Sequence, residues 1–123
     1  MNGLELRRRA LSTKKSHEPI NLIDVSQLRG SSVWWQGSRT GWTSECCTTP
    51  KIEVVPGTMY YLDRYSVRQD YVSLFDANSA YVKQVIWSSS PPPITVTIPD
   101  GIYFVGITIG TNYKDTAVFR PAD

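Results

Sequence analysis

Apolar and polar residues alternate along much of the chain. The clearest example is the stretch 94–98, with three apolar residues on one face and two threonines on the other. Strict alternation is typical of a β-strand with one buried face. Similar patterns, with a loop at 37–41, predict short strands at 32–36, 42–48, 51–55, 58–62, 71–75, 81–87, 94–98, 102–109 and 116–119. Many short strands separated by turns favour an antiparallel β-sandwich.

Residues that favour turns separate the predicted strands. Pro56-Gly57 predicts a turn, because proline presets φ and glycine accepts a positive φ. Asn78 falls between two strands that we expect to form a hairpin, and we expect it to adopt the left-handed conformation there. Gly106 interrupts an otherwise continuous strand and indicates a bulge or a close contact with another part of the chain.

The first 17 residues have a different pattern. Asn2 and Glu5 form a capping-box pattern that predicts a short helix over 3–13. Such a helix is shorter than the roughly 12–15 residues at which isolated helices become marginally stable, so we expect it to lie on a partner surface. We predict an anchoring arm at 1–17 before a single β-sandwich domain at 18–123; the alternative is a frayed, solvated terminus. The predicted anchoring residues are Leu4 and Leu11, seven apart on one face, with Arg7, Arg8 and Arg9.

Charge is divided unevenly between this arm and the body. Residues 1–17 carry five basic residues and one acidic residue, so the arm holds +4 while the whole chain holds +2. The body therefore carries −2. A nucleic-acid-binding body gathers lysine and arginine on itself, so we expect no nucleic-acid partner. No apolar stretch approaches the roughly 18 residues of a membrane span, and we expect no membrane insertion.

Residues that carry catalytic or metal chemistry are scarce. His17 is the single histidine, and it lies beside the arm. Cys46 and Cys47 are adjacent and cannot easily reach disulfide geometry, so we expect one thiol to point inward and the other outward. The aspartates fall at strand ends and turns, where this residue commonly supports turn geometry. We therefore predict no enzymatic activity, no metal site and no cofactor.

Tryptophans gather around the short loop at 37–41. An exposed aromatic platform flanked by hydrogen-bonding groups suits a flat, amphipathic ligand such as a sugar ring. The alternative is that Trp34 and Trp35 point to opposite faces of a strand, one into the core and one outward. A cation–π pair between Arg39 and Trp42 is a further structural alternative. The predicted glycan platform consists of Trp34, Gln36, Arg39, Trp42 and Tyr65.

Four segments carry a family resemblance: NLIDVSQLRG, IEVVPGTMYYL, YVSLFDANSAYV and ITVTIPDGIYFVGITI. Their order, over about residues 21–119, resembles a module common in bacteriophage tail, fibre and baseplate proteins. That module is related to galactose-binding-like and carbohydrate-binding jelly rolls. Family members often carry glycine in the turn where this chain has Ala77-Asn78-Ser79. No calcium-ligand set or sugar-binding signature carries across residue by residue.

The resemblance implies an all-β jelly roll, an antiparallel β-sandwich, behind a short N-terminal α-helical arm. It implies a non-enzymatic structural protein of the virion, displayed on a fibre, tail or capsid and assembled in the host cytoplasm. The expected partners are other virion proteins and further copies of the chain, with a trimer favoured because cyclic symmetry lets one patch serve every subunit. A cell-surface glycan is a further possible partner. The alternative, from a different class, is a free-standing glycan-binding module.

Overall fold

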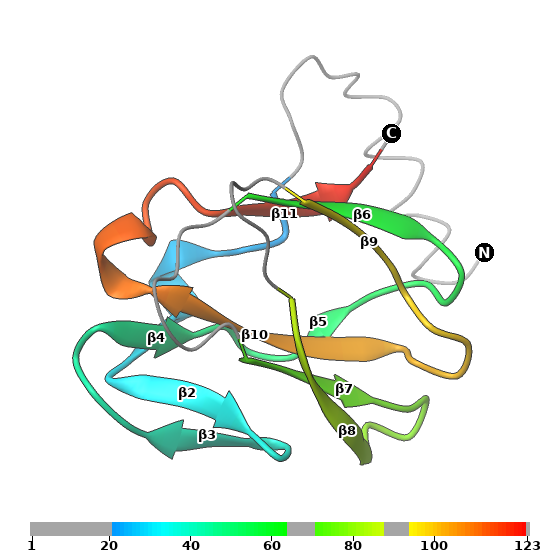
Figure 1. Cartoon of the computed structure of the whole chain (residues 1–123), viewed down its shortest axis with the longest axis horizontal. Helices are drawn as coiled ribbons and strands as arrows, with labels where there is room; N and C mark the ends of the chain where they lie inside the picture. Colours follow the sequence, from blue (N-terminus) through cyan, green and yellow to red (C-terminus); the bar gives the residue numbers. More distant parts are fainter. Residues whose placement is uncertain (1–20, 64–70, 88–93, 123) are drawn as a thin grey trace.

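A computed structural model of the chain describes residues 21–63, 71–87 and 94–122 (Figure 1). These residues form antiparallel strands and two short 3-10 helices, so the predicted all-β class is confirmed. The predicted helical arm at 1–17 lies outside the described residues. The elements, in chain order, are η1 (Val25–Gln27), β1 (Arg29–Gly30), β2 (Ser32–Trp35), β3 (Ser38–Gly41), β4 (Cys46–Thr48), β5 (Ile52–Glu53), β6 (Met59–Asp63), β7 (Tyr71–Phe75), β8 (Tyr81–Ile86), β9 (Ile94–Thr97), β10 (Phe104–Gly110), η2 (Thr111–Tyr113) and β11 (Val118–Pro121).

The central sheet has the strand order β1-β4-β10-β7-β8, with β5 also paired to β10. Strand β10 is its axis, because it pairs with β7 along one side and with β5 and then β4 along the other. The predicted hairpin of β7 and β8 is confirmed, and its register places Ser73 opposite Gln84 and Tyr71 opposite Ile86. Cross-strand partners share a face of the sheet, so these four side chains lie on one face.

A second sheet, β11-β6-β9, covers the other face of the central sheet (Figure 1). Alternation along β10 sends Val105, Ile107 and Ile109 into the space between the two sheets, and all three are buried. Phe119 of β11 lies in the same core and stacks on Tyr60, with 5.0 Å between the ring centroids. The side chains of this core are mostly apolar and are almost completely shielded from solvent. No helix in the described part of the chain has the length and apolar character needed to cross a membrane.

The segment at 37–41, predicted to be a loop, instead contains β3, which pairs with β2 in a separate hairpin. Gln36 and Gly37 form its two-residue turn, with φ of 48° and 88°. Two positive φ values in succession match the twist of a tight hairpin, so the chain can turn back immediately. The prediction failed because the polar, glycine-flanked sequence of β3 shows no alternation. The hairpin packs against β4, β7 and β10 on the face of the central sheet opposite the second sheet.

Strand β4 is shorter and more deeply buried than predicted. The chain between β3 and β4 is a return loop, in which the Trp42 N–H donates to the Ser31 carbonyl and the Cys46 N–H donates to the Thr43 carbonyl. Cys46 and Cys47 are both buried, so the expectation of one inward and one outward thiol is wrong. The reason is that β4 is an inner strand: one of its faces meets the apolar core and the other meets the β2–β3 hairpin.

The turn between β7 and β8 uses a different residue from the predicted one. Ser79, and not Asn78, has the left-handed backbone, with a φ of 65°. One carboxylate oxygen of Asp76 accepts hydrogen bonds from the backbone N–H groups of Asn78 and Ala80, at 2.8 and 3.0 Å. These bonds hold the turn around Asp76 and shift the left-handed position by one residue.

Candidate ligand-binding hollow

The β2–β3 hairpin separates its two tryptophans. Trp34 is 3% exposed and points to the central sheet, whereas Trp35 is 45% exposed. A Cβ atom at Gly106 would overlap the Trp34 ring, so Gly106 makes the close contact that its position in the strand indicates. The Trp34 indole N–H donates to the Thr49 carbonyl at 2.9 Å, and its ring meets Phe75 edge-on. Trp34 is therefore a core residue, which corrects its place in the predicted glycan platform.

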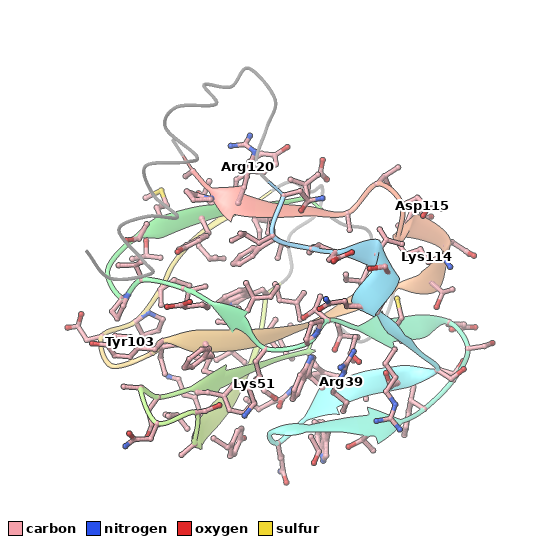
Figure 2. All side chains as sticks on the ribbon, turned by 180° about the vertical axis from the view of Figure 1, so that it is seen from behind. Arg39, Lys51, Tyr103, Lys114, Asp115 and Arg120 are labelled. Carbon is pink, nitrogen blue, oxygen red and sulfur yellow. The ribbon has the colours of Figure 1, made fainter. Side chains whose placement is uncertain are left out.

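Arg39 also belongs to the inner side of the hairpin. It lies opposite Trp34 on β3 and reaches toward the sheet (Figure 2). Its Nε donates to the Thr48 hydroxyl at 2.9 Å, and its Nη2 donates to the Thr48 carbonyl at 2.7 Å and to the Gln27 carbonyl at 3.2 Å. Burial, and then the positive charge of Arg29, lower the pKa of Arg39. These bonds fasten the hairpin to β4, so Arg39 is not placed to bind a ligand at the outer face.

The outer face of the hairpin forms an aromatic hollow of about 420 Å³. We use the name aromatic hollow for the space lined by Val33, Trp35, Thr40, Trp42 and Tyr71. Val33 and Thr40 are cross-strand partners, and Trp35 follows Val33 on the same face of β2. This volume falls within the roughly 300–1,000 Å³ of typical small-molecule sites.

Two of the hollow's aromatic side chains are widely open to solvent. Trp42 is 58% exposed in the return loop after β3. Trp35 meets Tyr71 edge-on, with 5.3 Å between ring centroids and 74° between ring planes. Ile86, opposite Tyr71 on the edge strand β8, is 62% exposed and extends the apolar surface from there. An exposed cluster of large apolar side chains is typical of a binding surface.

The chemistry of the lining is neutral. Its polar groups are two indole N–H donors, the Thr40 hydroxyl and the Tyr71 phenol, and none of the five side chains carries a charge. Gln36 lies in the adjacent turn with an exposed side chain and does not line the hollow. Tyr65, the remaining member of the predicted platform, lies outside the described residues. The structure thus keeps Trp42 from the predicted set and adds Trp35, Val33, Thr40 and Tyr71.

Groups for other chemistry do not converge in the part of the chain that the structure describes. No three of its histidine, cysteine, aspartate and glutamate side chains gather as a metal site would require. Burial raises the pKa of the Cys47 thiol, which donates to the Ile109 carbonyl at a sulfur–oxygen distance of 3.6 Å. A buried thiol that stays protonated is a packing group rather than a nucleophile.

The sequence contained part of the signal for the hollow. Alternation along β2 already separates Trp34 from Trp35, but it does not say which of them faces outward. Two residues of β10 decide which indole faces inward. Gly106 leaves room for the Trp34 ring, and the Thr108 hydroxyl accepts the backbone N–H of Trp34 at 2.9 Å. Tyr71 comes from a strand far along the chain, and no local pattern connects it to the hairpin.

The fold and the hollow together define an all-β protein that carries an aromatic-lined hollow on a surface hairpin, with no charged side chain among the five described residues that line it. Comparisons of the chain with models of known protein families, with curated proteins and with solved structures give no match. The resemblance to phage fibre and tail modules therefore stays a prediction from the sequence.

Proposed function

We propose that this protein is a non-enzymatic binding module that takes a neutral sugar ring in the aromatic hollow. The observation that carries the proposal is the pair of indoles, 45% and 58% exposed, placed around one hollow with Tyr71 held edge-on to Trp35. Exposed indole rings favour the binding of a ligand that removes their apolar surface from water. A pyranose ring presents such an apolar C–H face while its hydroxyl groups stay at the rim.

Within the described residues the lining of the hollow is uncharged, which supports a neutral sugar over an acidic one. A carboxylate or sulfate on a ligand requires a cationic partner to offset its lost hydration. Arg39 is the nearest arginine in sequence to the lining residues of the hairpin, and its guanidinium already donates to carbonyl and hydroxyl groups on the inner side. The indole N–H groups and the Thr40 hydroxyl can instead bond the hydroxyl groups of a neutral ring.

Replacing Trp42 with alanine tests this proposal. On a glycan array, the wild-type chain should retain neutral glycans, and Trp42→Ala should abolish their retention. The same change should lower stability by less than about 1 kcal/mol, because surface substitutions away from the core have small effects. If the wild-type chain retains no glycan, the hollow does not serve this function.

Tyr103→Ala is the matched control. Tyr103 is also an exposed aromatic residue, but it lies at the far end of the molecule from the hairpin (Figure 2). This variant should keep full glycan retention. Loss of retention in both variants would show that binding depends on general surface aromatics and not on the hollow.

The proposed architecture is a jelly-roll β-sandwich. Two antiparallel sheets that share one apolar core support it, as does the order of segments that resembles phage jelly-roll modules. The proposed setting is a phage particle, where the arm at 1–17 anchors the module to other virion proteins and the body assembles as a trimer. The support for this setting is the sequence resemblance and the +4 charge concentrated in the arm.

Mass spectrometry of purified virions tests the setting. The chain should be present as a particle component, and native mass spectrometry of the isolated chain should show a homo-oligomer. A monomeric chain that is absent from particles but binds glycans would favour the free-standing glycan-binding module.

A further inference from the structure

A hydrogen-bond network lies beneath the turn of the β2–β3 hairpin, and Gln84 of β8 is its centre. The Gln84 Oε1 accepts the backbone N–H of Gln36 at 2.7 Å and the hydroxyl of Ser73 at 2.9 Å. The Gln84 Nε2 donates to the backbone carbonyl of Trp34 at 2.8 Å. One side chain from the edge of the central sheet therefore bonds the peptide groups on both sides of Trp35.

The network leaves the amide of Gln84 a single orientation. Ser73 donates its one hydroxyl proton to Gln84 and accepts the backbone N–H of Gly37 at 3.1 Å. Rotating the amide by 180° would set its NH₂ group against the Gln36 N–H and its oxygen against the Trp34 carbonyl. Both contacts would oppose like groups, so the observed orientation is the only one that satisfies every partner.

This network also connects the two walls of the aromatic hollow. Ser73 lies two residues after Tyr71, on the same face of β7. Tyr71 meets Trp35 edge-on, and Ser73 together with Gln84 holds the backbone that carries Trp35. The distance between the two rings is therefore set by hydrogen bonds from the β7–β8 hairpin to the β2–β3 hairpin.

We propose that Gln84 is the positioning residue of the aromatic hollow: it holds the Trp35 indole in edge-on contact with Tyr71, so that the two rings present one fixed aromatic surface to a sugar ring. The importance of this position for binding rests on the proposed glycan function. The positioning itself is a property of the unliganded protein, and it can be measured without any glycan.

Replacing Gln84 with glutamate changes one donor into an acceptor. At neutral pH, the carboxylate of Gln84→Glu keeps an oxygen for Gln36 and Ser73 but turns a second oxygen toward the Trp34 carbonyl. A protonated carboxyl group restores the missing donor. The protonated form gains this bond, whereas the ionised form sets an oxygen against the Trp34 carbonyl, so we expect the pKa of the introduced glutamate to be raised in the folded state above its usual value of about 4.3. The position of Trp35 should then be native at pH about 4 and lost as the pH rises through the raised value.

Amide hydrogen exchange and the indole N–H resonance of Trp35 test this in the full chain without a ligand. At pH 7, Gln84→Glu should expose the Gln36 amide to exchange about tenfold faster than the wild type and shift the Trp35 resonance, with the amides of β10 unchanged. At pH 4 both differences from the wild type, measured at the same pH, should largely vanish. If Gln84→Glu at pH 7 showed the wild-type exchange rate at the Gln36 amide and the wild-type Trp35 resonance, the proposal would be overturned.

Two further variants complete the experiment. Asn112→Asp makes the same amide-to-carboxylate change at an exposed side chain of η2, away from the hairpin, and should leave the Gln36 amide and Trp35 as in the wild type at both pH values. If Gln84→Glu unfolds at pH 7, Gln84→Met removes the same bonds without introducing a charge. It should give the same faster exchange at Gln36, with no recovery at pH 4; wild-type exchange in this variant would also overturn the proposal.

Binding is then measured with the neutral glycan that the wild-type chain retains on the array. Gln84→Glu should bind it about tenfold more weakly at pH 7 and near wild-type strength at pH 4. Native binding at pH 7 despite a displaced Trp35 would overturn the role of Gln84 in the hollow. If no glycan is retained by the wild type, the proposed function fails, and the exchange data alone still decide whether Gln84 positions Trp35.

Discussion

The two faces of β10 are held by different forces. On one face, Val105, Ile107 and Ile109 enter an apolar core against the second sheet. On the other, Gly106 and Thr108 lie under the β2–β3 hairpin. Neighbouring residues of β10 therefore belong to two different layers. The stability of the core depends on the volume of its side chains, whereas the hairpin layer depends on the direction of its hydrogen bonds.

The hairpin layer is rich in hydrogen bonds between buried polar groups. The Thr108 hydroxyl accepts the Trp34 N–H, and the Ser32 and Thr48 hydroxyls bond each other at 2.8 Å. The Thr49 hydroxyl accepts the backbone N–H of Ile107 at 3.1 Å. Apolar cores tolerate changes of shape when volume is kept, whereas a buried polar group that loses its partner costs about 1–3 kcal/mol. Directional bonds therefore fix where the hairpin presents the aromatic hollow.

Truncating the apolar core should have the largest effect. Phe119→Ala removes a fully buried ring that stacks on Tyr60, so stability should fall by about 3–5 kcal/mol. Urea unfolding measures this loss. Val55→Ala, at an exposed aliphatic residue, is the control and should change the midpoint little. Equal losses in the two variants would contradict the assignment of the core to the space between the sheets.

Adding one methyl group to the hairpin face of β10 should have the next largest effect. Gly106→Ala would place a Cβ atom in the space of the Trp34 ring. That ring cannot move away easily, because it packs edge-on against Phe75 and its N–H bonds the Thr49 carbonyl, so the substitution should lower stability by about 1–3 kcal/mol. The indole N–H resonance of Trp34 should shift together with that of Trp35, because both are carried by β2.

Ile107→Val and Gly30→Ala are the matched comparisons for that change. The first removes one methylene from the apolar face of the same strand and should cost about 0.5–1.5 kcal/mol without moving Trp35. The second adds a methyl group where no atom lies within 4 Å, and it tests the effect of alanine alone. If Ile107→Val moves Trp35 as much as Gly106→Ala does, the two faces are not independent.

The alternation of residues predicted much of the fold but not the hairpin. Strands β7, β8 and β9 were predicted within one residue at either end, because β9 alternates strictly and β7 and β8 are rich in β-branched and aromatic residues beside turn residues. Strand β3 was missed because its polar residues leave no pattern to detect. The Gln36-Gly37 turn was missed because glutamine rarely adopts a positive φ.

The aromatic hollow could be predicted only in part, for the same physical reason. Trp42 was identified because an indole beside polar loop residues is informative by itself. Trp35, Tyr71 and Gln84 depend on contacts between strands that lie far apart in the sequence. Such contacts are decided by the packing of the hairpin on the central sheet, which a local pattern does not encode.

Deleting residues 1–17 should have the smallest effect on the body. Asn21 already ties the start of the described chain to β11: its amide donates to the Ala117 carbonyl at 3.0 Å and its Oδ1 accepts the Phe119 N–H at 3.1 Å. The truncated chain should melt within about 3 °C of the full chain, as a loss well below 1 kcal/mol implies. It should also fail to join its particle. A truncated body that does not fold would show that the arm is part of the core.

The indole N–H resonances of the chain's four tryptophans provide the most direct test of the central claim. Trp35 and Trp42 line the hollow, whereas Trp34 lies under the hairpin and Trp87 is partly buried and stacks on Phe119 at the side of the core. Titration with the neutral glycan retained on the array should shift the Trp35 and Trp42 resonances and leave those of Trp34 and Trp87 in place. Shifts confined to Trp34 and Trp87, or no shift at saturating glycan, would contradict sugar binding at the aromatic hollow.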